Sequence, residues 1–93
     1  MVIIMKAVVT VIGKDNVGIL AKVSAECSAH NANIVDVTQS VLQDMFTMIM
    51  LIDISDLSSD FSELSSSLQA LGEKIGMKVH VMHEDIFNSM HRI

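Results

Sequence analysis

The sequence contains no proline, no tryptophan and no tyrosine, and it has only four glycines among its 93 residues. It also has no low-complexity run, so no stretch has the composition of a linker between domains. We therefore expect one domain over residues 1–93, with a core over about residues 3–83 and a helical tail over residues 85–93. The 51% hydrophobic share is enough for one two-layer core.

Positive charge is scarce, because six Lys and Arg stand against eleven Asp and Glu, for a formal net charge of −5. The basic residues are scattered singly and offer no surface that would release counterions from phosphates. Aromatic residues are equally scarce, namely Phe46, Phe61 and Phe87, whereas an RNA-binding sheet needs exposed aromatic and basic side chains. We expect neither nucleic acid nor an anionic membrane as a partner.

Cysteine occurs once, as Cys27, so the chain cannot form an internal disulfide. The apolar stretch from Val2 to Met5 is interrupted by Lys6 and is too short for a signal sequence or a membrane span. These features favour a cytoplasmic location.

The first part of the chain has the pattern of a strand followed by a helix. Valine and isoleucine dominate from Val2 to Ile12, and Gly13 ends this predicted strand. Asp15 or Asn16 is the expected N-cap of the helix, which should stop near residues 31–33 because Asn tolerates the left-handed conformation. The predicted buried stripe consists of Ile19, Leu20, Val23 and Cys27.

An alternating segment follows and predicts a half-buried strand that returns as a hairpin. Its apolar positions are Val35, Val37 and Val41, and its polar positions are Asp36, Thr38 and Ser40. A turn at Gln43-Asp44 would pair Val41 with Phe46, Val37 with Met50 and Val35 with Ile52. The two apolar faces then coincide, which supports this register.

The second half has a clearer helix signal. Its apolar positions follow steps of three and four, at Phe61, Leu64, Leu68, Leu71 and Ile75. Asp60 and Glu63 resemble a capping box, and Gly76 ends the helix. A last strand from Met77 to Glu84 should turn Val79 and Val81 inward. The tail then carries Ile86, Phe87, Met90 and Ile93 at helical spacing.

This order of elements predicts an α+β protein, a ferredoxin-like βαββαβ sandwich whose two helices cover one face of a four-stranded antiparallel sheet, plus a short C-terminal helix. Right-handed crossovers place the first and third strands in the centre. The uncovered face would carry Val8, Thr10, Ile12, Thr47, Ile49 and Leu51. Because this face is too apolar to leave in water, we expect a dimer or the C-terminal helix to cover it.

The segment from Gly13 to Leu20 is the best candidate for chemistry. Gly18 falls at the expected start of a helix, where Gly is about 1 kcal/mol weaker than Ala in an interior position. A ligand that approaches the backbone there would account for it, because a helix N-terminus offers N–H groups to a carboxylate. The alternative is that Gly18 only allows close packing of the helix on the first strand.

The run Asp15-Asn16-Val17-Gly18-Ile19-Leu20 resembles the Asp-Arg-Pro-Gly-Ile-Leu signature of the ACT domain family, and Asn33-Ile34 resembles the family's entry to the second strand. The resemblance covers roughly residues 6–82, and the C-terminal ending is similar to small stand-alone bacterial members. It implies a regulatory module without a cofactor, in which a homodimer interface holds an amino acid or related metabolite. Carried over by position, the ligand-binding residues would be Asp15, Asn16, Val17, Gly18, Ile19, Asn33 and Ile34. The chain has Asn16 and Val17 where the signature has Arg and Pro, so the turn lacks a cation and a preset φ angle.

No other cluster predicts catalysis or a metal. His80 and His83 are three apart on a strand and point to opposite faces. No nucleophile turn accompanies His30, and Cys27 falls on a buried stripe, so we expect no enzyme and no metal site. The function that competes with ligand sensing is a dimeric assembly module that docks on a partner enzyme or regulator and binds nothing small.

Overall fold

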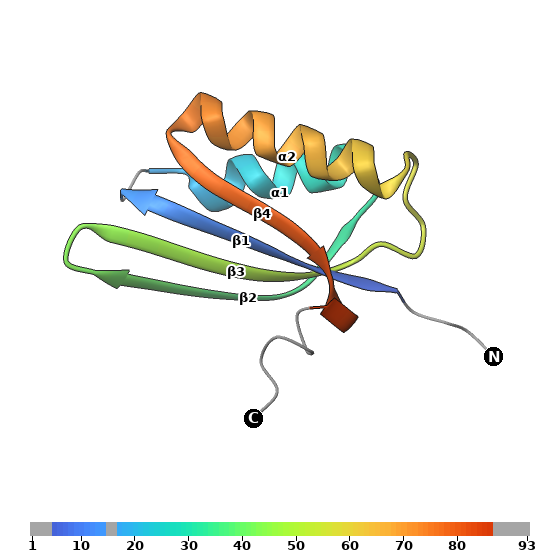
Figure 1. Cartoon of the computed structure of the whole chain (residues 1–93), viewed down its shortest axis with the longest axis horizontal. Coiled ribbons are helices and arrows are strands. Elements are labelled where there is room, and N and C mark those ends of the chain that lie inside the picture. Colours follow the sequence, from blue (N-terminus) through green and yellow to red (C-terminus); the bar gives the residue numbers. More distant parts are fainter. Residues whose placement is uncertain (1–4, 15–16, 87–93) are drawn as a thin grey trace.

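The computed structural model describes residues 5–14 and 17–86 (Figure 1). Its elements are β1 (Lys6–Lys14), α1 (Ile19–Ala29), β2 (Asn33–Leu42), β3 (Met45–Asp53), α2 (Phe61–Ile75) and β4 (Met77–His83). One further helical turn covers residues 84–86, where the C-terminal helix was predicted; residues 87–93 of that prediction lie outside the described residues. The predicted βαββαβ order is confirmed.

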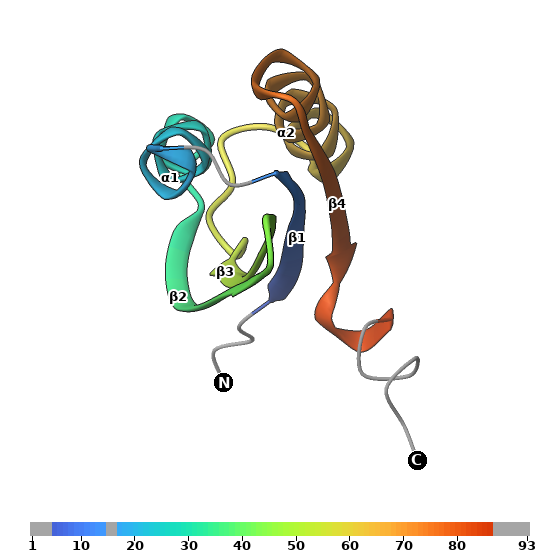
Figure 2. The same cartoon turned by 90° about the vertical axis from the view of Figure 1, so that its left-hand side faces the viewer.

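The four strands form one antiparallel sheet in the order β2-β3-β1-β4, so β1 and β3 are central, as predicted. Both long helices lie on the same side of this sheet, α1 over the β2 side and α2 over the β4 side (Figures 1 and 2). The strands β2 and β4 therefore form the two edges of the sheet.

The core lies between the sheet and the two helices. Ile19, Val23 and Cys27 of α1 are buried, while Leu20 is half-buried, so the stripe predicted for this helix is confirmed in its main positions. From the sheet and α2, the most deeply buried side chains are Val9, Val11, Met48, Met50, Ile52, Leu64 and Leu68. Methionine therefore supplies much of the core volume that aromatic residues supply in other domains.

The strand β1 reaches Lys14 and does not end at Gly13 as predicted. Gly13 pairs with Phe46 on one side and with Met77 on the other. A Cβ at Gly13 would collide with the Sδ of Met77 and would lie 3.2 Å from the carbonyl oxygen of Gly76. Gly13 therefore allows β1 to lie close to the start of β4. From the sequence alone, a glycine in this role looks the same as a glycine that ends a strand at a turn.

The start of α1 also differs from the prediction. The N-cap is Gly18, with φ of 82° and no hydrogen bond from a capping side chain, so the expected cap at Asp15 or Asn16 was wrong. Those two residues lie outside the described residues. The carbonyl oxygen of Gly18 accepts the first helical bond, from the N–H of Lys22 at 3.0 Å. A left-handed φ favours glycine because it has no Cβ, and this explains Gly18 before any ligand is considered.

At the end of α1 the prediction of a left-handed Asn is confirmed, because Asn31 has φ of 62°. The hairpin register holds at Val41, which pairs with Phe46, and at Val37, which pairs with Met50. Ile34, however, pairs with Ile52, and a bulge before Asp36 displaces the pair predicted for Val35.

We predicted that one face of β2 is buried, and this is wrong for the chain on its own. Val35 is 51% exposed and Val41 is 54% exposed, and only Val37 is half-buried. The physical reason is position: β2 is an edge strand, and its outer side has no neighbour in the described chain.

The second half agrees closely with the prediction. The Oδ1 of Asp60 accepts a hydrogen bond from the backbone N–H of Glu63 at 2.8 Å, which caps α2. Gly76 ends the helix with φ of 77°. Val79 is buried and Val81 is half-buried in β4, as expected for inward positions.

Candidate functional site

The turn before α1 is open to solvent. Val17 is 91% exposed, Gly18 is exposed, and a Cβ built on Gly18 would have no heavy atom within 4 Å. The first turn of α1 contains no acidic residue, and no described side chain caps it. By contrast, α2 begins with the Asp60 cap and Glu63. Among the described residues, the N–H groups and the positive end of the α1 dipole therefore have no side-chain partner, and such groups favour an anion.

The other predicted residues, Asn33 and Ile34, begin β2 and are exposed on the edge of the sheet. Asn33 pairs with Asp53 across the ladder, so their side chains share one face. Hydrogen bonds from the backbone N–H and the hydroxyl of Ser55 lower the pKa of the Asp53 carboxyl below its ordinary value. An ionised carboxylate thus lies beside the Asn33 amide, and the sequence analysis missed it because Asp53 is distant in the chain.

The predicted ligand site has two parts, the Gly18 turn and the start of β2 at Asn33, and in one chain they lie at opposite ends of the sheet. Lys14, which ends β1 before the Gly18 turn, pairs with Met45 at one end of β3, whereas Asn33 pairs with Asp53 at the other end. Eight residues of extended chain separate these ends by about 26 Å. Figure 1 shows the same separation between the end of β1 and the start of β2. A ligand of amino-acid size cannot touch both halves of one chain.

A polar cluster at the end of α1 was not anticipated from the sequence. The Nδ1 of His30 lies 2.6 Å from the Oγ of Ser59, and its Nε2 lies 3.1 Å from the Oγ of Ser67. The carboxylate of Glu26 lies 3.4 Å from the same Nε2. The Asn31 amide donates to the carbonyl oxygen of Asp56 at 2.6 Å. The cluster holds the segment that leads into Asn33 against the loop before α2.

Cys27 is fully buried in the core, as expected. Burial raises the pKa of its thiol to about 11, and the charge of Glu26 adds to this shift. The thiol is therefore protonated at neutral pH and is shielded from reagents.

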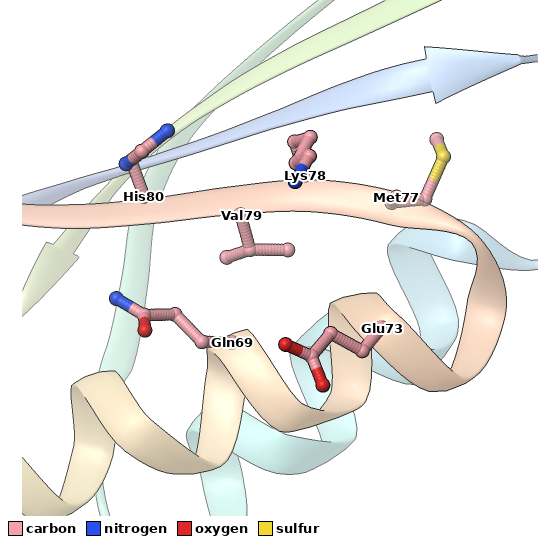
Figure 3. Close-up of a pocket in the computed structure, with 6 residues that line it drawn as sticks. All are labelled: Gln69, Glu73, Met77, Lys78, Val79 and His80. Carbon is pink, nitrogen blue, oxygen red and sulfur yellow. The ribbon is translucent and has the colours of Figure 1, made fainter.

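Three of the hollows on the described surface have linings that do not include Gly18, Asn33 or Ile34. One of 190 Å³ runs between α2 and the β4 edge, where Gln69 and Glu73 reach toward Val79 (Figure 3). Another, of 300 Å³, lies on the outer side of the helices beside Leu71 and Lys74. The third is on the sheet and measures 100 Å³.

Among residues 5–14 and 17–86, no three His, Cys, Asp or Glu side chains lie close enough together to hold a metal ion. His80 is exposed on the uncovered face of the sheet, whereas His83 stacks on Phe61 at 4.2 Å between ring centroids on the helix side. The two histidines thus point to opposite faces. Within the same described residues, no helix is long and apolar enough to cross a membrane.

The fold defines a small ferredoxin-like α+β domain, and the comparisons with known proteins give its family. The chain belongs to the ACT domain family, whose family model matches residues 6–82; such domains are typically regulatory and ligand-binding. A UPF0237 protein of Methanococcus maripaludis is 55% identical over 86 residues, which cover 92% of this chain and 96% of that protein. A UPF0237 protein of Listeria innocua is 48% identical over 96% of this chain and all of that protein.

Among solved structures, an ACT domain protein from Streptococcus pneumoniae is similar, with a TM-score of 0.78 and 38% sequence identity. The match covers 89% of this chain and 93% of that one. The recognition made from the Asp15–Leu20 and Asn33-Ile34 motifs is therefore confirmed at the level of the family.

Proposed function

We propose that this chain is a regulatory module that binds an amino acid or a related small metabolite between two copies, and that it is not itself an enzyme. The observation that carries the proposal is the separation of the two motif halves, which lie exposed at opposite ends of the sheet. A second copy that joins them completes a site that one chain leaves divided.

The edge strand β2 supports the choice of interface. It is ten residues long, it contains no proline and only one charged residue, Asp36, and Val35, Val41 and Leu42 are exposed, the last to 77%. Protected edges usually carry charge or proline, or are covered. The opposite edge, β4, carries Lys78 and His80 and lies against α2. Of the two edges, β2 is the one suited to pair with a second copy.

Antiparallel pairing of two β2 strands has the right geometry for the proposed site. If the twofold axis passes between Val37 and Thr38, Asn33 of the second copy lies opposite Leu42. Leu42 pairs with Met45, and Met45 pairs with Lys14, so these three residues form one row across the sheet. Because β1 ends at Lys14, the Gly18 turn that follows lies at the same end of the sheet as this row. The helix α1 also lies over the β2 side of the sheet (Figure 2). The open helix N-terminus of one copy then meets the start of β2 of the other.

The chemistry of the two halves suits a zwitterion. The N–H groups after Gly18 offer hydrogen bonds to a carboxylate, as helix N-termini do. From the second copy, the Asn33 amide and the Asp53 carboxylate offer acceptors to an ammonium group. Asn16 and Val17 replace the Arg and Pro of the family signature, so recognition of the carboxylate rests on the main chain.

The matched test is a comparison of Gly18→Asp with Gly18→Asn. Both side chains tolerate a left-handed φ and have nearly the same shape, and a Cβ here has open space around it. They differ in charge, so only Asp should repel a ligand carboxylate. We expect selected amino acids to raise the Tm of the wild type and of Gly18→Asn, because a ligand of the folded state stabilises it by mass action, and to leave Gly18→Asp unshifted.

The second candidate is an assembly module without a ligand, and the three hollows described above, none of which is lined by Gly18, Asn33 or Ile34, favour it. No thermal shift with any amino acid, on a protein that is folded and dimeric, would reject an amino acid as the ligand and leave assembly or a metabolite outside the screen as the function. A monomeric wild type would reject both.

A further inference from the structure

A hollow of 190 Å³ lies between α2 and the outer edge of the sheet at β4. Two side chains of α2, Gln69 and Glu73, reach into it from one side, and Val79 points toward them from the strand (Figure 3). Val79 is 7% exposed and gives the hollow an apolar floor. Because a water molecule occupies about 30 Å³ in the liquid, the hollow has room for about six waters, or for one long side chain.

The packing beside this hollow fixes the distance between the helix and the strand. A Cβ added at Gly72 would lie 2.5 Å from a methyl carbon of Val79 and 2.9 Å from the carbonyl oxygen of Met77. The backbone of α2 can approach β4 this closely because Gly72 has no side chain. The hollow is therefore formed before anything binds, as small binding sites in proteins usually are.

The strand β4 is the last strand on its side of the sheet. It pairs with β1 along its whole length, from Met77 to His83. In an antiparallel strand, every second residue directs its N–H and C=O groups away from the paired strand. Among the described residues, no strand pairs with these outward groups of β4. They form a template for one more strand, directly beside the hollow.

Charged side chains of opposite sign flank this open edge. Glu73 lies on the helix side, whereas Lys78 and His80 point to the other face of the strand (Figure 3). All three are exposed. In the part of the chain that the structure describes, none of the three side chains takes part in a hydrogen bond or a salt bridge. Their charged and polar groups are therefore available to a binding partner.

We propose that the β4 edge binds an extended segment of a partner protein, which adds a fifth strand to the sheet and places one basic side chain in the hollow beside Glu73. Side chains of a strand alternate between its two faces, so the residues on either side of the basic one lie beside Lys78 and His80 and should be acidic. The segment that fits has the pattern acidic–basic–acidic. In this mode of recognition, main-chain hydrogen bonds supply affinity and alternate side chains supply specificity.

The charges of the edge argue against a second copy of this chain as the occupant. If two β4 strands paired antiparallel about Val79, Lys78 of one copy would lie opposite His80 of the other. Neither side chain offers a carboxylate to the other, and lysine on an edge strand is a common device against such pairing. A segment with carboxylates at these two positions meets no conflict, so the edge discriminates between a partner and a copy. The inference rests on neither the ligand nor the β2 pairing proposed above.

Fluorescence anisotropy of labelled peptides, titrated with the full-length protein, tests the inference. The first peptide carries Val-Glu-Arg-Glu-Val at its centre. The second has the same composition in the order Val-Arg-Glu-Glu-Val, which turns a carboxylate toward Glu73. The third repeats the first with N-methyl groups on alternate main-chain nitrogens, which removes the donors that would pair with β4. We expect the first peptide to bind at least about fivefold more tightly than either of the others.

Substitutions on α2 test the basic position of the pattern. Glu73→Gln should weaken binding of the first peptide about 2–5-fold, as loss of an exposed ion pair does. Glu63→Gln is the matched control, because it removes the same charge from the same helix about 15 Å away, and it should bind as the wild type does. Glu73→Lys should instead prefer a peptide with Val-Glu-Glu-Glu-Val at its centre. A loss of folding cannot produce that reversal, and circular dichroism checks the fold of each variant.

Several results would overturn the inference: equal binding of the three peptides, no binding to the wild type at millimolar concentration, or equal affinities of Glu73→Gln and wild type. Amide chemical shifts locate the bound peptide and should change in β4 and around Glu73. Changes confined to β2 would reject the β4 edge as the site. If the first peptide binds only to a chain shortened to residue 86, residues 87–93 occupy the edge in the full chain and a partner protein does not.

Discussion

The Nδ1 of His30 lies 2.6 Å from the Oγ of Ser59, across 29 positions of the chain. This contact joins the C-terminal cap of α1 to the loop before α2, and the N–H of Ser58 also donates to the carbonyl oxygen of His30 at 3.0 Å. Asn33 begins β2 three residues later. The position of the proposed ligand residue is therefore set by contacts from distant parts of the sequence.

His30→Ala should lower the free energy of unfolding by about 1–2 kcal/mol, since it removes hydrogen bonds to Ser59 and Ser67 from a half-buried site. For a domain of this size, that corresponds to a fall in Tm of roughly 4–16 °C. Ser67→Ala should cost less, and Ser66→Ala, at an exposed neighbouring position, should be close to neutral. Urea unfolding of the three variants measures the difference; equal values for Ser66 and Ser67 would contradict the hydrogen-bonded role.

Gly18→Ala should destabilise the fold by about 1 kcal/mol, because Ala in a left-handed conformation places its Cβ near the carbonyl oxygen. Gly18→Asn should cost less. Since a Cβ at Gly18 has no heavy atom within 4 Å, contact with the rest of the fold should add nothing. Denaturant melts in the absence of ligand compare the variants. Equal losses for Ala and Asn would point to a packing role for Gly18.

Gly72→Ala should lower stability by about 1–3 kcal/mol through overpacking, even though Ala is the better helix former by about 1 kcal/mol. Its Cβ would lie 2.5 Å from a methyl carbon of Val79 and 2.9 Å from the carbonyl oxygen of Met77. Ala70→Gly, on the exposed side of the same helix, should also destabilise, for the opposite reason. A gain in stability for Gly72→Ala would show that α2 can move away from β4.

Cys27 should make stability depend on alkaline pH. The folded-state pKa of about 11 lies above the ordinary 9.0, so between these values the unfolded chain loses a proton that the folded chain keeps. Stability from this group is therefore full below pH 9 and falls by about 2–3 kcal/mol as pH rises toward 11. Unfolding of wild type and Cys27→Ala at pH 8 and pH 11 measures it. The same pH dependence in both would assign the loss to other groups.

The sequence predicted the α2 half of the fold well because its signals are local. The capping box at Asp60 and Glu63 and the glycine stop at Gly76 are satisfied within one or two turns of backbone. The alternation in β1 and β3 likewise placed Ile12 and Ile49 on the uncovered face, since side-chain direction in a strand follows from its period of two.

The sequence failed where burial depends on neighbours. The alternation of Val35 and Val41 predicted a half-buried strand, yet both are exposed because β2 is at the edge of the sheet. A bulge at Val35 also displaced the predicted pairing. The order of elements along the whole chain predicted that β2 lies at an edge, but the alternation within this segment does not show it, and the bulge has no local signal either.

By itself, the sequence determined the order of the elements, the helix stops and the residues that carry the ACT motif, because periodicity, capping and left-handed positions are properties of short segments. Only the tertiary structure decided that Gly18 and Asn33 lie at opposite ends of one sheet, and that Asp53 and His30 lie beside the segment that carries Asn33. Such distances are set by strand pairing between residues remote in the chain, where each side chain's neighbours are fixed by the register of the whole sheet.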